Sequence, residues 1–348
     1  MRPADLRSDT VTRPTPAMRT AMAEAEVGDA EYDDDPTVLR LQERAAEITG
    51  KEAALYLVTG TMCNQIAMHL FARPGFFVVC ARGSHVAGVE VATSSLLSGL
   101  SFVEVPSEDG TLVAEDLAGA FEEDPDRGNV VDLVSVENTH ALGGGTPWAV
   151  DDLRAVRKVT TEAGTPLYMD ASRIFNASVA TGTPVDEYAA EADALMFCLS
   201  KGLGAPIGSV LCGSREFIGE AKATKILFGI SWRQAGVTAA AGLVALETAP
   251  GRLHEDHENA RRLAEGIAEI TPGAVEPARV RTNMMFVDPA KLGMSATDAA
   301  ARLEAHGVLV NVVSGKVRFV THIDVSSEDI DRALAAWREL ARSGARSS

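Results

Sequence analysis

Lys201 is the residue of this 348-residue chain whose surroundings most clearly favour covalent chemistry. It follows an apolar run at 194–199 and lies within Ser200-Lys-Gly-Leu-Gly-Ala-Pro-Ile-Gly-Ser209, a segment of mostly small residues. Partial burial favours the neutral amine, which can attack a carbonyl group to form a Schiff base. The alternative is a surface lysine in a glycine-rich loop. Lys201 is therefore a candidate nucleophile.

Asp170 and the segment 59–65 could hold a ring nitrogen and a phosphate group, respectively. Asp170 ends the apolar run 166–170, where a carboxylate can pair with a pyridinium nitrogen. Thr59-Gly-Thr-Met-Cys-Asn-Gln65 follows an apolar run and opens a helical pattern, so its free backbone N–H groups can bind phosphate. The structural alternatives are a helix-capping aspartate and a glycine-containing turn with a threonine cap.

Three further side chains could contact a flat cofactor or an anion. His85 follows the run 76–80 and could stack on a ring, although a histidine near a loop is more often a surface residue. Arg233 and Arg318 carry planar guanidinium groups, which bind phosphate or carboxylate through paired hydrogen bonds. Either arginine could equally form a surface ion pair.

These residues follow the strands expected of an α/β domain. Short apolar runs alternate with helical patterns, and they lie at 76–80, 101–105, 130–136, 166–170, 194–199 and 207–212. Continuous apolar runs are typical of a mostly parallel sheet covered on both faces. Ligands bind such sheets beyond the carboxyl ends of the strands. Glu137-Asn-Thr-His140, Asp170 and Ser200-Lys201 stand at these ends.

A domain boundary is expected near residue 250. An alanine-rich helical stretch at 238–249 ends at Pro250-Gly251, and a charged helix follows at 254–270. We assign residues 1–250 to an N-terminal segment and a large domain, and 251–348 to a small α+β domain. The small domain is expected to contain strands within 280–287, 308–312 and 317–321 and a final helix at 327–343.

Composition narrows the classes of partner. A net charge of -17 disfavours nucleic acid and anionic membrane surfaces, which attract positively charged proteins. The polar N-terminus lacks the apolar centre of a secretory signal, and no apolar run approaches the length of a membrane span, so we expect a cytoplasmic protein. The cysteines lack metal-ligand spacing, so we expect buried thiols and no metal site; they are Cys63, Cys80, Cys198 and Cys212.

Taken together, segments along most of the chain resemble the threonine aldolase family of pyridoxal-phosphate enzymes. In order they are Asp5-Leu-Arg-Ser-Asp-Thr-Val-Thr12, Val27-Gly-Asp29, Asp35-Pro-Thr37, Gly50-Lys-Glu-Ala-Ala54, Gly60-Thr-Met62, Glu137-Asn-Thr-His140, the 200–209 segment and Arg233-Gln234. The resemblance implies the aspartate aminotransferase-like fold, known as fold type I. It also implies pyridoxal 5'-phosphate as cofactor and a homotetramer, a dimer of dimers, with active sites between chains.

The resemblance also assigns roles by position. Lys201 would carry the cofactor as a Schiff base, Asp170 would pair with its ring nitrogen, and His85 would stack on the ring. The phosphate would be held by Gly60, Thr61 and Arg233. The substrate would be contacted by Ser8, Arg173 and Arg318 at its carboxylate, by His140 near its hydroxyl group, and by Tyr32.

The implied activity is cleavage of the Cα–Cβ bond of L-threonine, L-allo-threonine or a related β-hydroxy-α-amino acid, which yields glycine and an aldehyde. His140 is the first candidate for the base that removes the hydroxyl proton, and His85 or a water molecule is the second. Two alternatives are a β-eliminating lyase or transaldolase acting on another amino acid, and a catalytically silent scaffold. The joint presence of Lys201, Asp170 and Arg318 argues against a scaffold.

Several residues depart from the family's pattern near the expected site. Tyr168 stands where the family usually has histidine, and Ala171-Ser172 stands where it has Gly-Ala. Asp33-Asp34-Asp35 replaces Gly-Glu-Asp, and Ser231-Trp232 replaces glycine and methionine. These changes motivate the alternatives of elimination and transaldolation.

Overall fold

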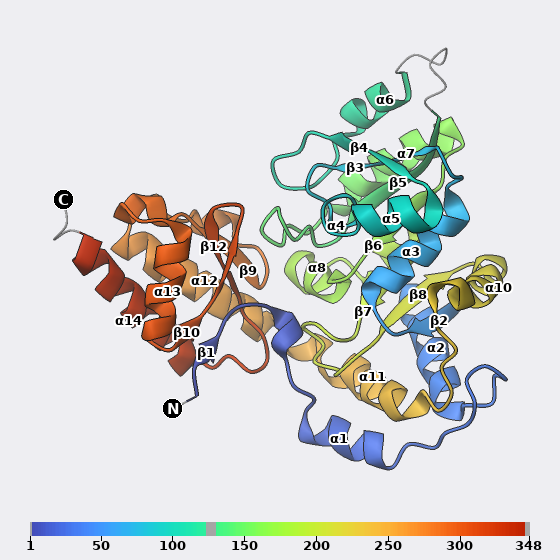
Figure 1. Ribbon diagram of the computed structural model, residues 1–348, viewed down its shortest axis with the longest axis horizontal. Helices are drawn as coiled ribbons and strands as arrows, with labels where there is room; N and C mark the ends of the chain where they lie inside the picture. Colours follow the sequence, from blue (N-terminus) through green and yellow to red (C-terminus); the bar gives the residue numbers. More distant parts are fainter. Residues whose placement is uncertain (1, 123–129, 345–348) are drawn as a thin grey trace.

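A seven-stranded sheet forms the centre of the larger of two units in the computed structural model, which describes residues 2–122 and 130–344 (Figure 1). The strands lie in the order β2 (Ala53–Leu57), β8 (Ser209–Gly213), β7 (Ala194–Cys198), β6 (Leu167–Asp170), β5 (Val131–Glu137), β3 (Phe77–Ala81) and β4 (Ser101–Val105). Six of these strands run in the same direction, and β8 runs in the opposite direction, antiparallel to both β2 and β7. The predicted α/β class with a mostly parallel sheet is confirmed.

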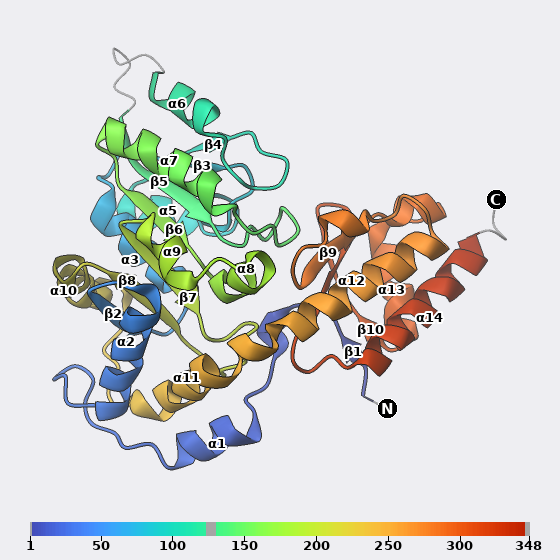
Figure 2. The same ribbon diagram turned by 180° about the vertical axis from the view of Figure 1, so that it is seen from behind.

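Helices cover both faces of the sheet (Figures 1 and 2). One face packs on α3 (Gly60–Phe71) and α10 (Arg215–Thr224), and α5 (Val91–Ser98) packs on α3. The other face packs on α2 (Pro36–Thr49), α7 (Val150–Ala163), α9 (Val185–Ala190) and α11 (Gly236–Thr248).

Successive strand residues enter opposite cores, and both cores are apolar. In β2, for example, Ala54 and Tyr56 belong to the core that includes α2, while Leu55 and Leu57 belong to the core that includes α3. A strand that is buried on both faces needs apolar residues at every position. This arrangement accounts for the continuous apolar runs in the sequence.

The smaller unit contains a three-stranded antiparallel sheet in the order β11 (Asn311–Val313), β12 (Lys316–Val320) and β9 (Met284–Val287). Its helices are α12 (Leu253–Ile270), α13 (Ala296–Ala305) and α14 (Ser327–Gly344). The boundary expected near 250 falls in the short turn η4 (Pro250–Arg252) between α11 and α12. Leu253, the first residue of α12, still belongs to the core of the larger unit, whereas Leu263 belongs to the core of the smaller unit. The chain therefore passes from one core to the other within α12.

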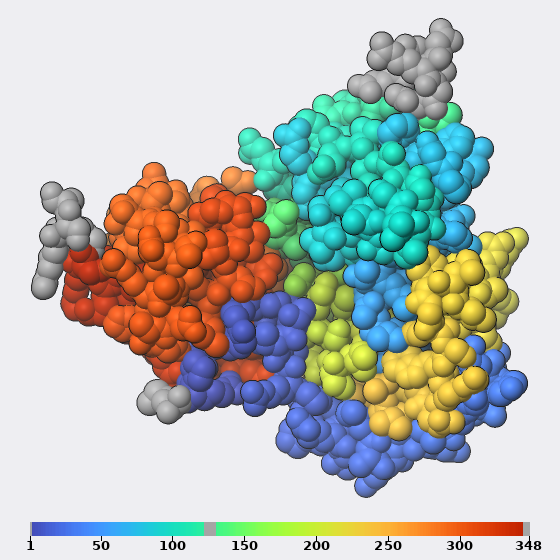
Figure 3. All heavy atoms as spheres, viewed as in Figure 1, coloured from blue at the N-terminus to red at the C-terminus, as the bar shows by residue number. Residues whose placement is uncertain are grey.

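The N-terminal segment also contributes to the smaller unit. Strand β1 (Ala4–Asp5) pairs in parallel with β10 (Val308–Leu309), and Leu6 is buried in the C-terminal core. Figure 3 shows this blue segment lying across the border between the orange unit and the rest of the molecule. Residues 4–6, which the sequence analysis grouped with the large domain, thus tie the two units together.

The remaining helical elements are α1 (Pro16–Ala23), α4 (His85–Gly88), α6 (Ala114–Glu122), α8 (Ile174–Thr181), η1 (Asp9–Val11), η3 (Lys225–Phe228), η5 (Pro277–Arg279) and η6 (Pro289–Leu292). Helix α1 packs on α11 (Figure 2). Within the described part of the chain, no helix is both long and apolar enough to cross a membrane. The four cysteines are buried free thiols, as predicted.

Candidate active site

A cavity of about 290 Å³ lies beyond the carboxyl ends of β2, β3, β6 and β7. It is lined by Gly60, Thr61, Asn64, His85, Asp170 and Lys201, among others. These residues follow four separate strands, and because these strands run parallel to one another, all four connections lie at one edge of the sheet. The fold therefore gathers the predicted nucleophile, carboxylate, histidine and phosphate-binding segment in one place.

Lys201 lies in the loop that follows β7, and its backbone is held in place. Its carbonyl oxygen accepts hydrogen bonds from Gly204 N (2.9 Å) and Thr12 Oγ1 (3.2 Å). The side chain is half-buried and lines the cavity, and its amine has no hydrogen-bond or ion-pair partner among the described residues. The amine is therefore available to a ligand.

Asp170 is a buried, firmly held carboxylate with 3% of its surface exposed. Asn64 Nδ2 donates to Oδ2 (2.9 Å), and Ser172 donates to Oδ1 from its backbone nitrogen (3.1 Å) and its hydroxyl group (2.6 Å). Burial acts to raise the pKa of Asp170, but the positive charges of Lys201 and His85, with these hydrogen bonds, lower it below the usual value. Asp170 is therefore charged and able to accept a hydrogen bond from a protonated ring nitrogen.

His85 begins α4 and presents its ring to the cavity. Its backbone nitrogen donates to Glu137 Oε2 (2.8 Å), and its Nδ1 lies 2.9 Å from Glu90 Oε1. The hydrogen bond to Glu90 raises the pKa of His85; burial opposes this, and the charges of Asp170, Glu90 and Glu137 reinforce it. Sequence reasoning missed Glu90, which lies five residues after His85 at the N-cap position of α5.

The first turn of α3 faces the cavity with free backbone donors. Thr59 caps the helix through its Oγ1, which accepts from Met62 N (3.1 Å), while Gly60 and Thr61 line the cavity. A Cβ atom at Gly60 would lie 2.6 Å from Met196 Cε, so glycine allows the helix to begin this close to β7. A helix N-terminus with unpaired N–H groups favours an anion such as phosphate.

Arg173 forms a buried ion pair that the sequence analysis did not foresee. Its Nε and Nη2 donate to Asp9 Oδ2 and Oδ1 at 2.7 Å each, and 7% of Arg173 and none of Asp9 is exposed. Burial acts to raise the pKa of Asp9, but the charge and hydrogen bonds of Arg173 outweigh it and lower the pKa to about 2. Ser8, the neighbour of Asp9, caps η1 by accepting from Thr10 N (3.2 Å).

Arg318 lies in β12, and its guanidinium is only partly satisfied. Nη2 donates to Arg7 O (3.2 Å), whereas Nε is buried without a hydrogen-bond partner in the described structure. Burial and the positive charge of Arg173 lower the pKa of Arg318. A buried donor without an acceptor, beside a second cation, fits the binding of an anion such as a carboxylate.

His140 does not line the cavity. Its ring is buried, with Nδ1 accepting from Gly143 N (2.9 Å) and Nε2 lying 3.7 Å from Glu137 Oε2. A Cβ atom at Gly110 would lie 1.9 Å from the His140 ring, so the ring packs closely against this glycine. Glu137 thus contacts both the His140 ring and the backbone of His85.

Tyr32 and Arg233 also lie outside the Lys201 cavity. Tyr32 is 78% exposed. The Arg233 side chain is 54% exposed, and its Nη1 donates to Asp29 Oδ2 (3.3 Å). Five of the eleven predicted site residues line the cavity, namely Gly60, Thr61, His85, Asp170 and Lys201. The other six lie outside its lining, and they are Ser8, Tyr32, His140, Arg173, Arg233 and Arg318.

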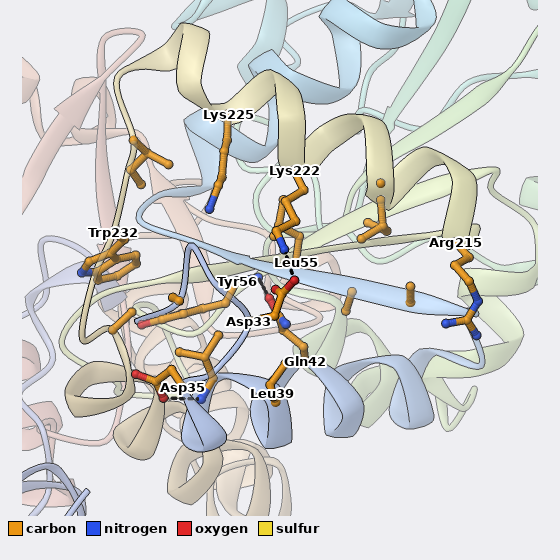
Figure 4. Close-up of a pocket in the computed structure, with 18 residues that line it drawn as sticks. Asp33, Asp35, Leu39, Gln42, Leu55, Tyr56, Arg215, Lys222, Lys225 and Trp232 are labelled. Atoms are coloured by element: carbon orange, nitrogen blue, oxygen red, sulfur yellow. Dashed lines mark hydrogen bonds and ion pairs between the residues drawn. The ribbon is translucent and has the colours of Figure 1, made fainter. Parts of the chain in front are cut away.

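The loop 29–35, which carries Tyr32, covers a second cavity of about 260 Å³ (Figure 4). Lys222 binds Asp33, and Lys225 Nζ donates to Glu31 Oε1 (2.6 Å). On the opposite side, Trp232 stacks on Tyr56 with ring centroids 5.1 Å apart. Ion pairs and an aromatic contact therefore fix this loop and the segment before α11 against the large unit.

The fold and the Lys201 cavity are those of an α/β enzyme, and the cavity offers groups suited to an anion and to a ring nitrogen. An unpartnered amine, a charged buried carboxylate and a helix N-terminus line this cavity, and the partly satisfied Arg318 lies outside its lining. Residues 5–290 match the sequence profile of the beta-eliminating lyase family.

Comparison with known proteins agrees with this class. The chain is 40% identical to low-specificity L-threonine aldolase 1 of Arabidopsis thaliana, over 97% of this chain and 96% of that protein. It is 39% identical to the low specificity L-threonine aldolase of Escherichia coli K12, over 96% and 98%. The Leishmania major threonine aldolase structure has the same fold, with a TM-score of 0.81 at 18% identity over 97% and 100% of the two chains.

The chain belongs to the beta-eliminating lyase family, and the threonine aldolases are its relatives within it. The family resemblance found in the sequence is thereby confirmed.

Proposed function

We propose that this protein is a pyridoxal-phosphate-dependent aldehyde-lyase that cleaves L-threonine, L-allo-threonine or a related β-hydroxy-α-amino acid to glycine and an aldehyde. The observation that carries the proposal is the meeting of Lys201 and Asp170 in one cavity beside the first turn of α3. The threonine aldolase relatives, which match nearly the whole chain, support the choice of substrate class.

The residues present fit the cofactor. Lys201 has an unpartnered amine for its aldehyde, Asp170 has a charged carboxylate for its ring nitrogen, and Gly60 and Thr61 have N–H groups for its phosphate. When bound, the ring accepts the electron pair released by the broken bond. Burial acts to raise the pKa of Asp170, but the hydrogen bonds from Ser172 and Asn64 act to lower it and do not depend on the charge of Lys201. They favour the ionised carboxylate, which is the state that pairs with a protonated ring.

Arg173 and Arg318 supply the proposed grip on the substrate carboxylate. Asp9 occupies Nε and Nη2 of Arg173, which leaves Nη1, and Arg318 has the unsatisfied Nε. Two guanidinium groups that hold one carboxylate fix the rotation of the amino acid about Cα. This orientation decides whether the Cα–Cβ bond, rather than another bond at Cα, stands perpendicular to the cofactor ring.

Cleavage also needs a group that accepts the β-hydroxyl proton. His85 lines the cavity and has Nε2 without a partner among the described residues, whereas His140 is buried outside the lining. We therefore propose His85, directly or through a water molecule, as the proton acceptor in preference to His140, our first candidate from sequence. His140 would then support His85 through Glu137.

The proposed assembly is a homotetramer in the cytoplasm, without nucleic-acid or membrane partners. Exposed apolar side chains support association, in particular Tyr32 (78%), Leu96 (84%) and Leu227 (71%). Association would allow Tyr32 and Arg233 to complete the site of a neighbouring chain. Light scattering coupled to size-exclusion chromatography tests this, and a monomer that is fully active would contradict it.

The function is tested by absorbance spectroscopy of the purified protein with pyridoxal 5'-phosphate, before and after addition of L-threonine, with acetaldehyde and glycine measured together. We expect a cofactor band in the visible range and equimolar products. Lys201→Ala should lose the band and at least about a thousandfold in activity, because the nucleophile is absent. Ammonia and a 2-oxo acid without glycine would instead support β-elimination. Absence of the cofactor band in the wild type would support the alternative of a catalytically silent scaffold.

A further inference from the structure

Glu90 and Asn64 form a buried connection between His85 and Asp170. Glu90 Oε1 lies 2.9 Å from His85 Nδ1 and accepts from Asn64 Nδ2 at 3.1 Å, and the same Asn64 nitrogen donates to Asp170 Oδ2 at 2.9 Å. Glu90 is 2% exposed and Asn64 is 1% exposed. One amide group thus joins the two carboxylates that contact opposite parts of the proposed site.

The orientation of the Asn64 amide follows from its three partners. Its nitrogen faces two carboxylate oxygens, and its Oδ1 accepts from the Tyr168 hydroxyl group at 2.8 Å. The reversed amide would place an oxygen against both carboxylates, which is repulsive. Tyr168, which departs from the family's histidine, therefore fixes Asn64 and through it both carboxylates.

The second oxygen of Glu90 is also satisfied. Gln65 Nε2 donates to Glu90 Oε2 at 2.8 Å, so the carboxylate is held at both oxygens by side chains of α3. A buried carboxylate held in this way cannot rotate without breaking hydrogen bonds in a low-dielectric environment. The Nδ1 atom of His85 therefore faces a fixed acceptor.

We propose that Glu90 is a positioning residue for the reaction: it fixes the His85 ring with the proton on Nδ1, so that Nε2 faces the cavity as the proton acceptor. This inference rests on the proposed function. In the step, the β-hydroxyl proton moves to Nε2 and the O–H electron pair forms the aldehyde carbonyl; the cofactor, when bound, would take up the electron pair of the broken Cα–Cβ bond. Glu90 stabilises the imidazolium that results.

Three other charged groups surround His85 in the described structure. Glu137 accepts its backbone N–H, and Asp170 lies across the cavity beyond Asn64. Lys201 carries the opposing positive charge in the same cavity. Of the carboxylates, Glu90 is the one in hydrogen-bond contact with the ring, so removal of its charge should have the largest effect on the ring's proton affinity.

The first test uses the protein without cofactor, so it does not depend on catalysis. Nitrogen NMR of the histidine side chains should show Nδ1–H on neutral His85 in the wild type. In Glu90→Gln, the pKa of His85 should fall by about one unit, a tenfold loss of proton affinity. Ser98→Ala is the matched control: Ser98 ends helix α5, at whose N-cap position Glu90 stands, and it contacts His69 at 3.0 Å. This change should leave the His85 signals unchanged.

The second test uses the loaded enzyme. Glu90→Gln should lower kcat by about tenfold or more with little change in KM, and it should move the acidic limb of the pH–rate profile to lower pH by the shift found by NMR. Glu90→Asp keeps the charge and should recover part of both losses. A merely structural Glu90 would leave the pH profile in place.

The outcomes separate the inference from the function on which it rests. If His85 has the same pKa and proton position in Glu90→Gln and Glu90→Asp as in the wild type, the inference is wrong, whatever the activity. If the wild type forms no glycine while the NMR shift is present, the proposed function fails and the positioning of His85 by Glu90 stands. Circular dichroism shows whether each variant is folded.

Discussion

The Lys201 cavity and the loop 29–35 both contain paired charges, but the pairs are built differently. Around Lys201, Asp9 and Arg173 are almost wholly buried, and each carboxylate has several donors. In the loop, Asp33 pairs with Lys222 while its side chain is 60% exposed, and Arg233 pairs with Asp29 while 54% exposed. Charges around the cavity are therefore fixed by the chain itself, whereas most of those in the loop remain open to solvent or to another chain.

The difference concerns the cost of losing a partner. A buried charge that loses its partner is left in a low-dielectric environment, while an exposed one regains water. The same substitution should thus have unequal effects in the two regions. The loop also contains one buried exception, the Lys225–Glu31 pair, with 6% and 15% of the side chains exposed, which separates the effect of burial from that of location.

The largest effect is expected for Asp9→Asn. This change leaves the Arg173 guanidinium buried beside a neutral amide, so the free energy of unfolding should fall by about 3–5 kcal/mol. Urea denaturation at neutral pH measures it. The KM for the amino acid should rise as well, because Arg173 loses its fixed position. A loss of stability below about 1 kcal/mol would show that the buried pair does not constrain this region.

Glu31→Gln is expected to have the next largest effect, because it leaves the Lys225 ammonium buried without a counter-charge. Partial exposure of Glu31 reduces the cost, and we expect a loss of about 2–3 kcal/mol in the free energy of unfolding. The measurement is the same urea titration. If Glu31→Gln matches the exposed pairs of the loop, location rather than burial governs the comparison.

A pH-dependent effect of about 2–3 kcal/mol is expected from His257, which lies in α12 and contacts Asn176 of α8. Its Nε2 accepts from Asn176 Nδ2 (3.1 Å), and burial, with the charge of His254, lowers its pKa to about 4 from 6.5. The unfolded chain therefore binds a proton that the folded chain does not, and stability falls as the pH drops from about 6.5 to 4. In His257→Gln this part of the loss should be absent in urea titrations across that range, and parallel curves for the two proteins would contradict the assignment.

The smallest effect is expected for Asp33→Asn, the exposed counterpart of Glu31→Gln. Lys222 regains water when the pair is lost, so the free energy of unfolding should change by less than about 1 kcal/mol. Asn also tolerates the left-handed backbone at this position, where φ is 57°. A loss as large as that of Glu31→Gln would mean that the loop acts as one cooperative network.

A further change at Asp33 separates the effect of its backbone conformation from the effect of its ion pair with Lys222. The φ of Asp33 is 57°, which is strained for most side chains but which glycine adopts freely. In a Lys222→Met background, where the ion pair is already absent, Asp33→Gly should raise the thermal midpoint slightly, equivalent to less than about 1 kcal/mol. A lower midpoint would show that Asp33 has another role.

The sequence by itself determined the class of fold and the family, and it marked residues that the structure gathers in one cavity. Apolar runs of strand length are local signals, because a strand buried on both faces needs apolar side chains at each position. Lys201, Asp170 and the 59–65 segment were found because each stands at the end of such a run. Parallel strands then carry these ends to one edge of the sheet, so their meeting followed from the predicted topology.

Only the tertiary structure decided which groups hold these residues. Asp9 reaches Arg173 across 164 positions, and Asn64 reaches Asp170 across 106, so no local pattern signals either contact. The orientation of the His140 ring could not be predicted from the sequence either, because it depends on how closely Gly110 packs against the ring. The burial of a residue at a strand end can be predicted from the apolar residues beside it in the sequence. The partner of a buried charge cannot, because it depends on how distant segments pack together.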